Sequence, residues 1–137
     1  MIKPDLFLTL EIGSDTKKVT DIISLLPQTD QVKYYNIGDL RERDKSLYKE
    51  SFYRYRYYDY EAFDANLFVE NFFKEIDSGL LIKIIALGFD VILIFHIIMP
   101  RNINTVDSIL LPDAGLSAVI MKLLSEIGID YHVNFSI

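Results

Sequence analysis

The sequence has no cysteine and only two histidines among its 137 residues. Without cysteine the chain can form neither a disulfide framework nor a thiolate metal site, and this composition is most expected in a reducing compartment. The N-terminal segment MIKPDLFLTLEIGSD also lacks the long apolar region of a signal peptide. We therefore expect a cytoplasmic protein.

Basic residues are in deficit as well. Lysine and arginine number 14 against 20 aspartates and glutamates, and the net charge is −6. A negative field of this kind repels nucleic acid and attracts basic partners. Residues 41–56 combine a local excess of positive charge with aromatic side chains, but a single-strand binder needs a continuous positive track. We expect no nucleic-acid binding.

The chain contains one long apolar run, Leu80 to Met99, LLIKIIALGFDVILIFHIIM. Lys83 and Asp90 would each cost about 2.5 to 3.5 kcal/mol near the centre of a bilayer, which offsets the gain from the aliphatic residues. Gly88 divides the run at a point where a helix would end and a strand begin. We predict a buried helix–strand pair and no contact with a membrane.

Periodicity predicts the remaining elements. Alternating apolar residues predict strands over residues 4–12, 51–60 and 129–137, and residues 89–99 predict a strand that is apolar on both faces. The polar 28–50 segment predicts a solvated loop with one short strand over residues 32–37.

Helical spacing predicts a helix through Val19, Ile22, Ile23 and Leu26 that ends at Pro27, a helix that Asp64 caps, and a short helix over residues 80–87. A last helix is predicted to begin at Asp113, with an apolar stripe of Leu116, Val119, Ile120, Leu123, Leu124 and Ile127.

This order of elements predicts the fold class. No repeat or linker interrupts the chain, so residues 1–137 are expected to form a single α+β domain. Strands with one polar face favour a sandwich in which a mixed or mainly antiparallel sheet has helices packed on one face.

The segment SFYRYRYYDY, Ser51 to Tyr60, is the most unusual stretch. Tyr53, Tyr55 and Tyr57 are predicted to face the helices, because the opposite choice would bury unpaired arginines at a high cost. The other set is predicted to face outward: Phe52, Arg54, Arg56, Tyr58 and Tyr60.

No arrangement of residues indicates a reaction. His96 and His132 lie on predicted strands with Asp90 and Asp130 on matching faces, but metal binding or acid–base catalysis needs more groups that converge on one point. Half-exposed histidines on a sheet explain the pattern better. We therefore expect no enzyme activity, no catalytic residue, no metal and no cofactor.

Several landmarks occur together along the chain: the strand DLFLTLEI, the helix VTDIISLLP, the turn Asn36-Ile37-Gly38-Asp39, and the closing segment PDAGLSAVIMKLLSEIGIDYHVNFSI. In this layout the chain resembles a family of small bacterial α+β domains of unknown function, with members associated with toxin immunity. The resemblance implies a binding protein that neutralises a cognate bacterial toxin.

Tyrosine and arginine are enriched at binding hot spots, because each combines a large contact area with directed hydrogen bonds. We therefore predict a partner-binding surface on the outward sheet face and the nearby acidic loop, for a cognate toxin or another protein partner of basic charge. Its candidate residues are Asp39, Glu42, Asp44, Arg54, Arg56, Tyr58, Tyr60, Ile92 and Ile94.

Two alternatives stay open. The outward isoleucines could be covered by the 28–50 loop or by a second copy of the chain in a homodimer. The protein could also be a small-ligand or regulatory binding module, which would show a deep closed pocket with convergent polar groups rather than a broad surface patch.

Overall fold

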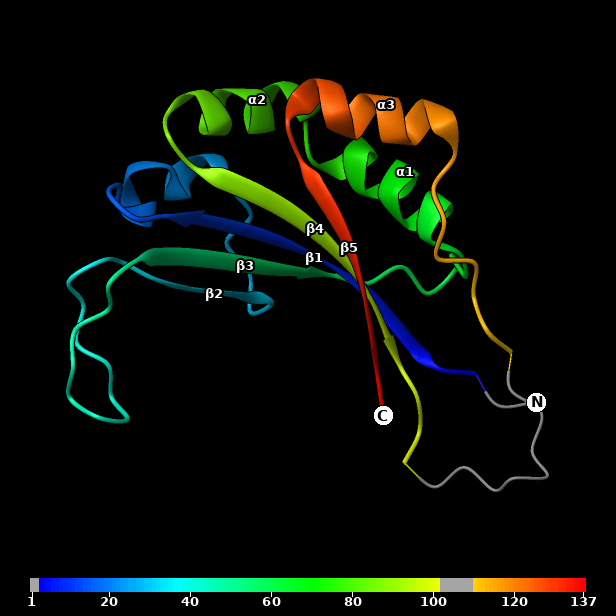
Figure 1. Cartoon of the computed structure of the whole chain (residues 1–137), viewed down its shortest axis with the longest axis horizontal. Helices are drawn as coiled ribbons and strands as arrows, with labels where there is room; N and C mark the ends of the chain where they lie inside the picture. Colours follow the sequence, from blue (N-terminus) through cyan, green and yellow to red (C-terminus); the bar gives the residue numbers. More distant parts are fainter. Residues whose placement is uncertain (1–2, 102–109) are drawn as a thin grey trace.

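Five strands form one mixed sheet in the order β2-β3-β1-β4-β5 (Figure 1). The structure is a computed structural model that describes residues 3–101 and 110–137. The strands from β2 to β4 pair antiparallel with their neighbours, whereas β5 pairs parallel with β4. The strands are β1 (Asp5–Ser14), β2 (Val32–Tyr35), β3 (Ser51–Tyr57), β4 (Asp90–Ile98) and β5 (Asp130–Ser136). The helices are α1 (Ala65–Glu75), α2 (Ser78–Ala86) and α3 (Ala118–Ile127).

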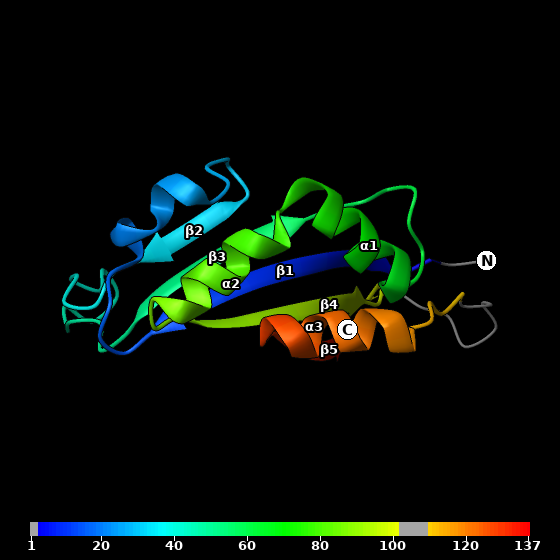
Figure 2. The same ribbon diagram turned by 90° about the horizontal axis from the view of Figure 1, so that it is seen from above.

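The predicted α+β class and the position of the helices are confirmed, because all three helices lie on one face of the sheet. Seen from above, α1 and α2 lie over β3 and β1, and α3 lies over β5 (Figure 2). Side chains alternate between the two faces of a strand, so Leu8, Leu10 and Ile12 of β1 all point into the core and are fully buried. Phe68 of α1 packs edge-to-face on Phe95 of β4, with 5.3 Å between the ring centroids.

The predicted register of the aromatic strand is confirmed. Tyr53 is fully buried, Tyr57 is 6 % exposed and Tyr55 packs partly buried against the core. The Tyr53 hydroxyl donates a hydrogen bond to the Pro27 carbonyl at 2.8 Å, which satisfies the polar end of a buried ring. The strand ends at Tyr57, earlier than the predicted Tyr60.

The helix predicted through Val19 and Leu26 is wrong. Two 3₁₀ turns, Val19–Asp21 and Ile23–Leu25, stand in its place. The segment is short, ends before Pro27 and is rich in β-branched side chains, which lose rotamer freedom in a helix. Val19, Ile22 and Leu26 are nevertheless buried, so the apolar pattern correctly identified the core residues.

The last helix begins later than predicted. Ser117, not Asp113, caps α3, and its hydroxyl accepts a hydrogen bond from the Ile120 amide at 3.3 Å. Leu116 therefore lies outside the helix, and Val119 is 77 % exposed instead of buried. The buried stripe is narrower than the predicted one and consists of Ile120, Leu124 and Ile127. The predicted cap of α1 is confirmed, because Asp64 accepts from the Leu67 amide at 2.8 Å.

The long apolar run folds as the predicted helix–strand pair, with α2 and β4 on either side of Gly88. This glycine has a φ of 101°, which ordinary side chains rarely adopt, and it ends the helix. Asp77 caps α2 by accepting a hydrogen bond from the Gly79 amide at 3.0 Å. Within residues 3–101 and 110–137, no helix has both the length and the apolar character needed to cross a membrane.

Candidate partner-binding face

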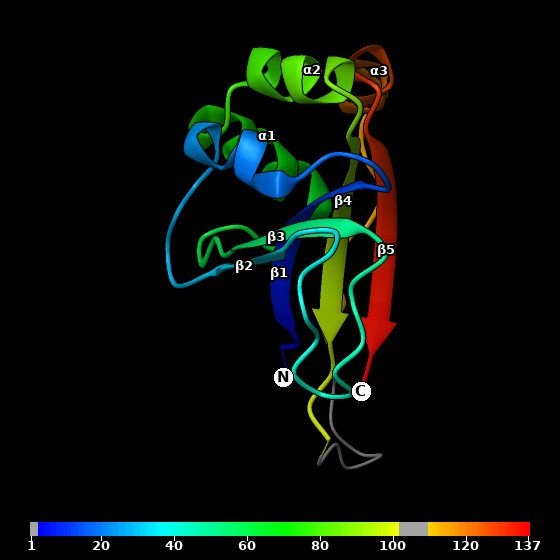
Figure 3. The same cartoon turned by 90° about the vertical axis from the view of Figure 1, so that its left-hand side faces the viewer.

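The candidate site is the sheet face opposite the helices, which we call the open face. Figure 3 shows α1, α2 and α3 together at one side of the sheet, while the connection between β2 and β3 extends in the opposite direction. The pairing register places two rows of side chains across this face. One row is Arg54, Glu11, Ile92 and Asp130, and the next is Arg56, Thr9, Ile94 and His132.

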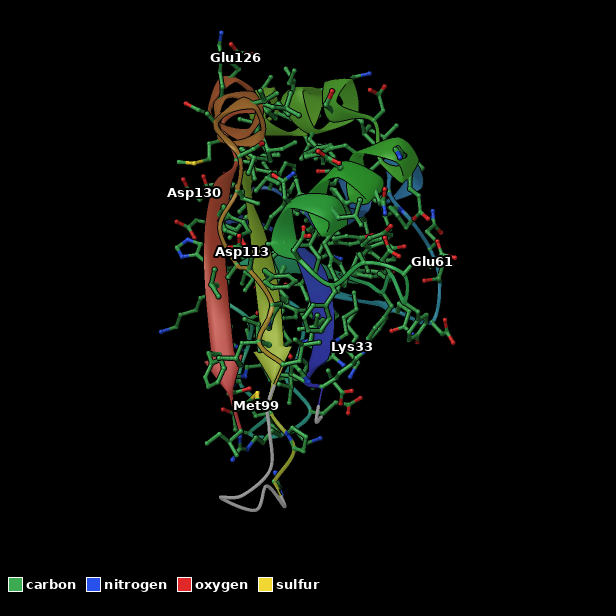
Figure 4. All side chains as sticks on the ribbon, turned by 90° about the vertical axis from the view of Figure 1, so that its right-hand side faces the viewer. Lys33, Glu61, Met99, Asp113, Glu126 and Asp130 are labelled. Carbon is green, nitrogen blue, oxygen red and sulfur yellow. The ribbon has the colours of Figure 1, made fainter. Side chains whose placement is uncertain are left out.

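Two strand ends mark the borders of this surface. Figure 4 shows Asp130 at the start of β5 and Met99 beyond the end of β4, at opposite ends of the two parallel strands. Ile94 lies midway along β4, and Ile92 lies nearer its start, opposite Asp130. Both isoleucines are partly exposed, and the aligned arginines lie two strands away in the same rows.

A chain of hydrogen bonds crosses the centre of the open face. Asn134 Nδ2 donates to His96 Nδ1 at 3.0 Å, and His96 Nε2 lies 3.0 Å from Thr9 Oγ1. The Thr9 hydroxyl donates in turn to Glu11 Oε2 at 3.2 Å. This order of donors assigns the proton of a neutral imidazole to Nε2, because Nδ1 accepts from the amide.

The surroundings of His96 favour this neutral form. Burial lowers the pKa of the imidazole, and the positive charges of Arg56 and Arg54 lower the pKa further. The ring also stacks on Phe7, with 4.4 Å between the centroids and 12° between the planes. Thr9 below it is only 1 % exposed, although it lies on the face without helices. His96 is therefore a structural centre of the open face.

Arg54 and Arg56 are half-buried cations without a counter-ion. Among the described residues, no carboxylate oxygen lies within 4 Å of either guanidinium. The Nε atoms of both side chains are buried and have no hydrogen-bond partner within residues 3–101 and 110–137. Glu11 is the cross-strand neighbour of Arg54, but its Oε2 accepts from Thr9. The Arg56 guanidinium lies 5.4 Å from the centroid of the Phe7 ring.

The predicted aromatic residues lie at one border of this cluster. Tyr58 follows β3 and packs 5.4 Å from Phe7, measured between ring centroids. Tyr60 stacks on Tyr58 at 6.2 Å and is 93 % exposed, so it forms the rim of the face and not a part of the strand. The structure thus brings Arg54, Arg56, Tyr58, Ile92 and Ile94 onto one surface, with Tyr60 at its edge.

The acidic loop residues are placed differently. Asp39 accepts from the Asn36 amide at 2.8 Å, and Asp44 accepts from the Ser46 hydroxyl at 2.6 Å. The hydrogen bond from Ser46 lowers the pKa of the Asp44 carboxyl. These two side chains therefore shape the loop. Glu42 alone of the three lines the groove that the loop forms with Lys33 and Arg54.

The loop flanks the open face at the β2 and β3 end. Tyr48 of the loop stacks on Tyr35 of β2, with 3.6 Å between the ring centroids. Phe52 also packs against Tyr35, with 5.6 Å between the ring centroids. Ile92 and Ile94 stay partly exposed beyond this contact. Glu50 at the end of the loop lines a hollow together with Ile92, so the loop borders this isoleucine without burying it.

The hydrogen-bond chain is the part of the site that sequence reasoning missed. Its signal was present, because Thr9 and Glu11 alternate with buried leucines in β1 and His96 interrupts an apolar strand. The two histidines lie on neighbouring strands as expected, but two positions out of register, since His96 pairs with Asn134 and His132 with Ile94. Within the described ranges, no three His, Asp or Glu side chains are placed to hold a metal ion.

No protein-family model, curated protein or solved structure matches this chain.

Proposed function

We propose that this protein is a non-catalytic binding protein of the immunity type, which neutralises a cognate bacterial toxin in the cytoplasm by binding it through the open face. The observation that carries the proposal is the arginine pair, which has no counter-ion among the described residues, in the same cross-strand rows as two partly exposed isoleucines. Such a combination of apolar area and directed donors is typical of binding hot spots. The toxin as partner comes from the family resemblance.

The shape of the surface supports a protein partner over a small ligand. Two hollows at the borders of the open face, one lined by Lys33 and Arg54 and the other by Tyr58 and Tyr60, open to solvent. A small-ligand site would enclose most of its ligand. The net charge of −6 further favours a partner with basic charge, since opposite net charges speed association.

The test is co-purification with the product of the gene next to that of this chain. We expect a complex with the unmodified protein and loss of that complex for Ile94→Lys and for Tyr58→Ala. Val119→Lys on α3 is the matched control, because this side chain is 77 % exposed on the helical side. The control should retain the complex, and co-expression should restore growth of cells that carry the toxic neighbour.

Circular dichroism separates loss of binding from loss of folding in these variants. If the neighbouring product is not toxic and forms no complex, the immunity function is wrong. If a complex forms and folded Ile94→Lys and Tyr58→Ala retain it while Val119→Lys loses it, binding occurs through the helices and not the open face.

A further inference from the structure

Arg54 and Arg56 are the least satisfied charged groups of the open face. Each has a buried Nε–H without an acceptor, and a buried donor that lacks a partner is destabilising. Glu11 is the cross-strand neighbour of Arg54, and its Oε2 accepts from Thr9 in the hydrogen-bond chain that continues to His96. The cross-strand neighbour of Arg56 is Thr9, which carries no charge.

We infer that the partner inserts a carboxylate side chain, an aspartate or glutamate flanked by apolar residues, onto the Arg54 and Arg56 pair of the open face. This inference rests on the proposed function and names the chemistry of the contact. The two arginines are alternate residues of β3 on one face, so both guanidinium groups can reach the same acidic segment. Ile92 and Ile94, in the same two rows, receive the apolar neighbours.

A carboxylate fits these observations better than other anions do. The planar guanidinium presents its donors as a fork that matches a carboxylate in two parallel hydrogen bonds, which the terminal Nη groups of these partly exposed side chains can donate. Phosphate groups carry more negative charge, and the net charge of −6 opposes a dianion more strongly than a monoanion. Ile92 and Ile94 in the same rows also favour a peptide over a free ion, because a peptide can place apolar side chains on them.

The inference refines the charge of the expected partner. Net charge acts at long range and favours a basic partner, whereas the contact itself requires a local acid. The partner is therefore expected to be basic as a whole and to carry an acidic residue at the centre of its binding surface. His96 reports the contact, because its pKa is lowered in part by the two arginines. A carboxylate that neutralises them should raise that pKa.

The experiment is an NMR titration of the full chain with an acetylated and amidated pentapeptide, Val-Val-Glu-Val-Val, and with its Gln counterpart. The Glu peptide should shift the Arg54 and Arg56 Nε–H signals and raise the His96 pKa, and it should bind on the order of tenfold more tightly than the Gln peptide. Arg54→Gln with Arg56→Gln should abolish this preference. Arg43→Gln in the exposed loop is the matched control for lost charge, and it should retain the preference.

Each outcome decides the inference. Equal binding of the Glu and Gln peptides, or an unchanged preference in the double arginine variant, overturns it. Tighter binding of inorganic phosphate than of the Glu peptide also overturns it and identifies a phosphate site. If the neighbouring gene product binds through the open face but tolerates Arg54→Gln and Arg56→Gln, the inference fails while the proposed function stands. If the Glu peptide binds as expected and no protein complex forms, the carboxylate preference stands and the proposed function fails.

Discussion

Neighbouring side chains of β3 face opposite environments. Tyr53 is fully buried and donates its hydroxyl proton to a backbone carbonyl, whereas Arg54 lies on the open face with no carboxylate within 4 Å among the described residues. Long cationic side chains can lie along an apolar surface and leave their heads at the solvent side. Alternation along one strand thus separates residues that stabilise the fold from residues that are free to bind.

This contrast predicts an order of stabilities. Tyr53→Ala should lower the free energy of unfolding by about 3 to 5 kcal/mol, as truncation of a buried aromatic does, and Tyr55→Ala should cost less because this ring is only partly buried. The double substitution Arg54→Ala with Arg56→Ala should change the free energy of unfolding by no more than about 1 kcal/mol. Urea unfolding of the three variants measures the order. An arginine variant that unfolds while Tyr53→Ala is silent would contradict the assignment of the faces.

At the scale of elements, the short helices owe their stability to the few residues that reach the sheet. In α3 the buried positions are Ile120, Leu124 and Ile127, with Leu123 only partly buried beside them. The adjacent Met121 is 58 % exposed. A ten-residue helix is marginal in water by itself, so packing of this narrow stripe decides whether it forms.

Three alanine substitutions in α3 test this arrangement. Leu124→Ala should lower the free energy of unfolding by about 2 to 5 kcal/mol, because it leaves a cavity that the neighbours fill only in part. Leu123→Ala should cost clearly less, and Met121→Ala should have little effect because its side chain is exposed. Thermal melts and urea titrations give the three values. Equal losses for Leu123 and Leu124 would show that the helix is rotated relative to the sheet.

At the scale of the whole molecule, one face of the sheet carries the core and the other is the open face, for which we propose a partner. Helices cover the first face, and on the second a hydrogen-bond chain links β1, β4 and β5 beneath a set of partly exposed side chains. The stability of this second face depends on a neutral His96. Protonation of its Nδ1 would remove the acceptor for Asn134 and place a third positive charge beside the two arginines.

The folded protein should therefore lose stability in mild acid. Burial first, and then Arg56 and Arg54, lower the His96 pKa in the folded state below the value of about 6.5 expected for the unfolded chain. At a pH between these two pKa values, His96 is protonated in the unfolded state and neutral in the folded state. The contribution of His96 is thus complete above about pH 6.5 and declines as the pH falls toward the folded pKa.

Urea unfolding at a series of pH values between about 7.5 and 5 measures how steeply the free energy of unfolding falls with pH. His96→Gln should reduce it, whereas His132→Gln is the matched control, because His132 is exposed and lies outside the hydrogen-bond chain of Asn134, His96, Thr9 and Glu11. An identical slope in His96→Gln and in the unmodified protein would refute a role for this histidine.

Local patterns of the sequence determined much of the architecture. The period of two in β1, β3 and β4 correctly predicted which side chains face the helices, because alternation is a property of the extended backbone itself. The α+β class, the cap at Asp64 and the division of the long apolar run at Gly88 followed from equally local rules. Five of the candidate contact residues, Arg54, Arg56, Tyr58, Ile92 and Ile94, were correctly expected to share the outward face.

Only the tertiary structure decided the rest. The 3₁₀ turns at Val19–Asp21 and Ile23–Leu25 replace the predicted helix although Val19, Ile22 and Leu26 are buried, so the apolar period identified buried residues without determining the backbone conformation. The order of strands places β1 between β3 and β4, and this alone brings Thr9 to His96 across 87 positions of sequence. Whether an arginine meets a carboxylate depends on cross-strand register and on side-chain rotamers, which distant segments set together. For this reason the sequence predicted an outward arginine pair, while its lack of a counter-ion emerged only from the folded sheet.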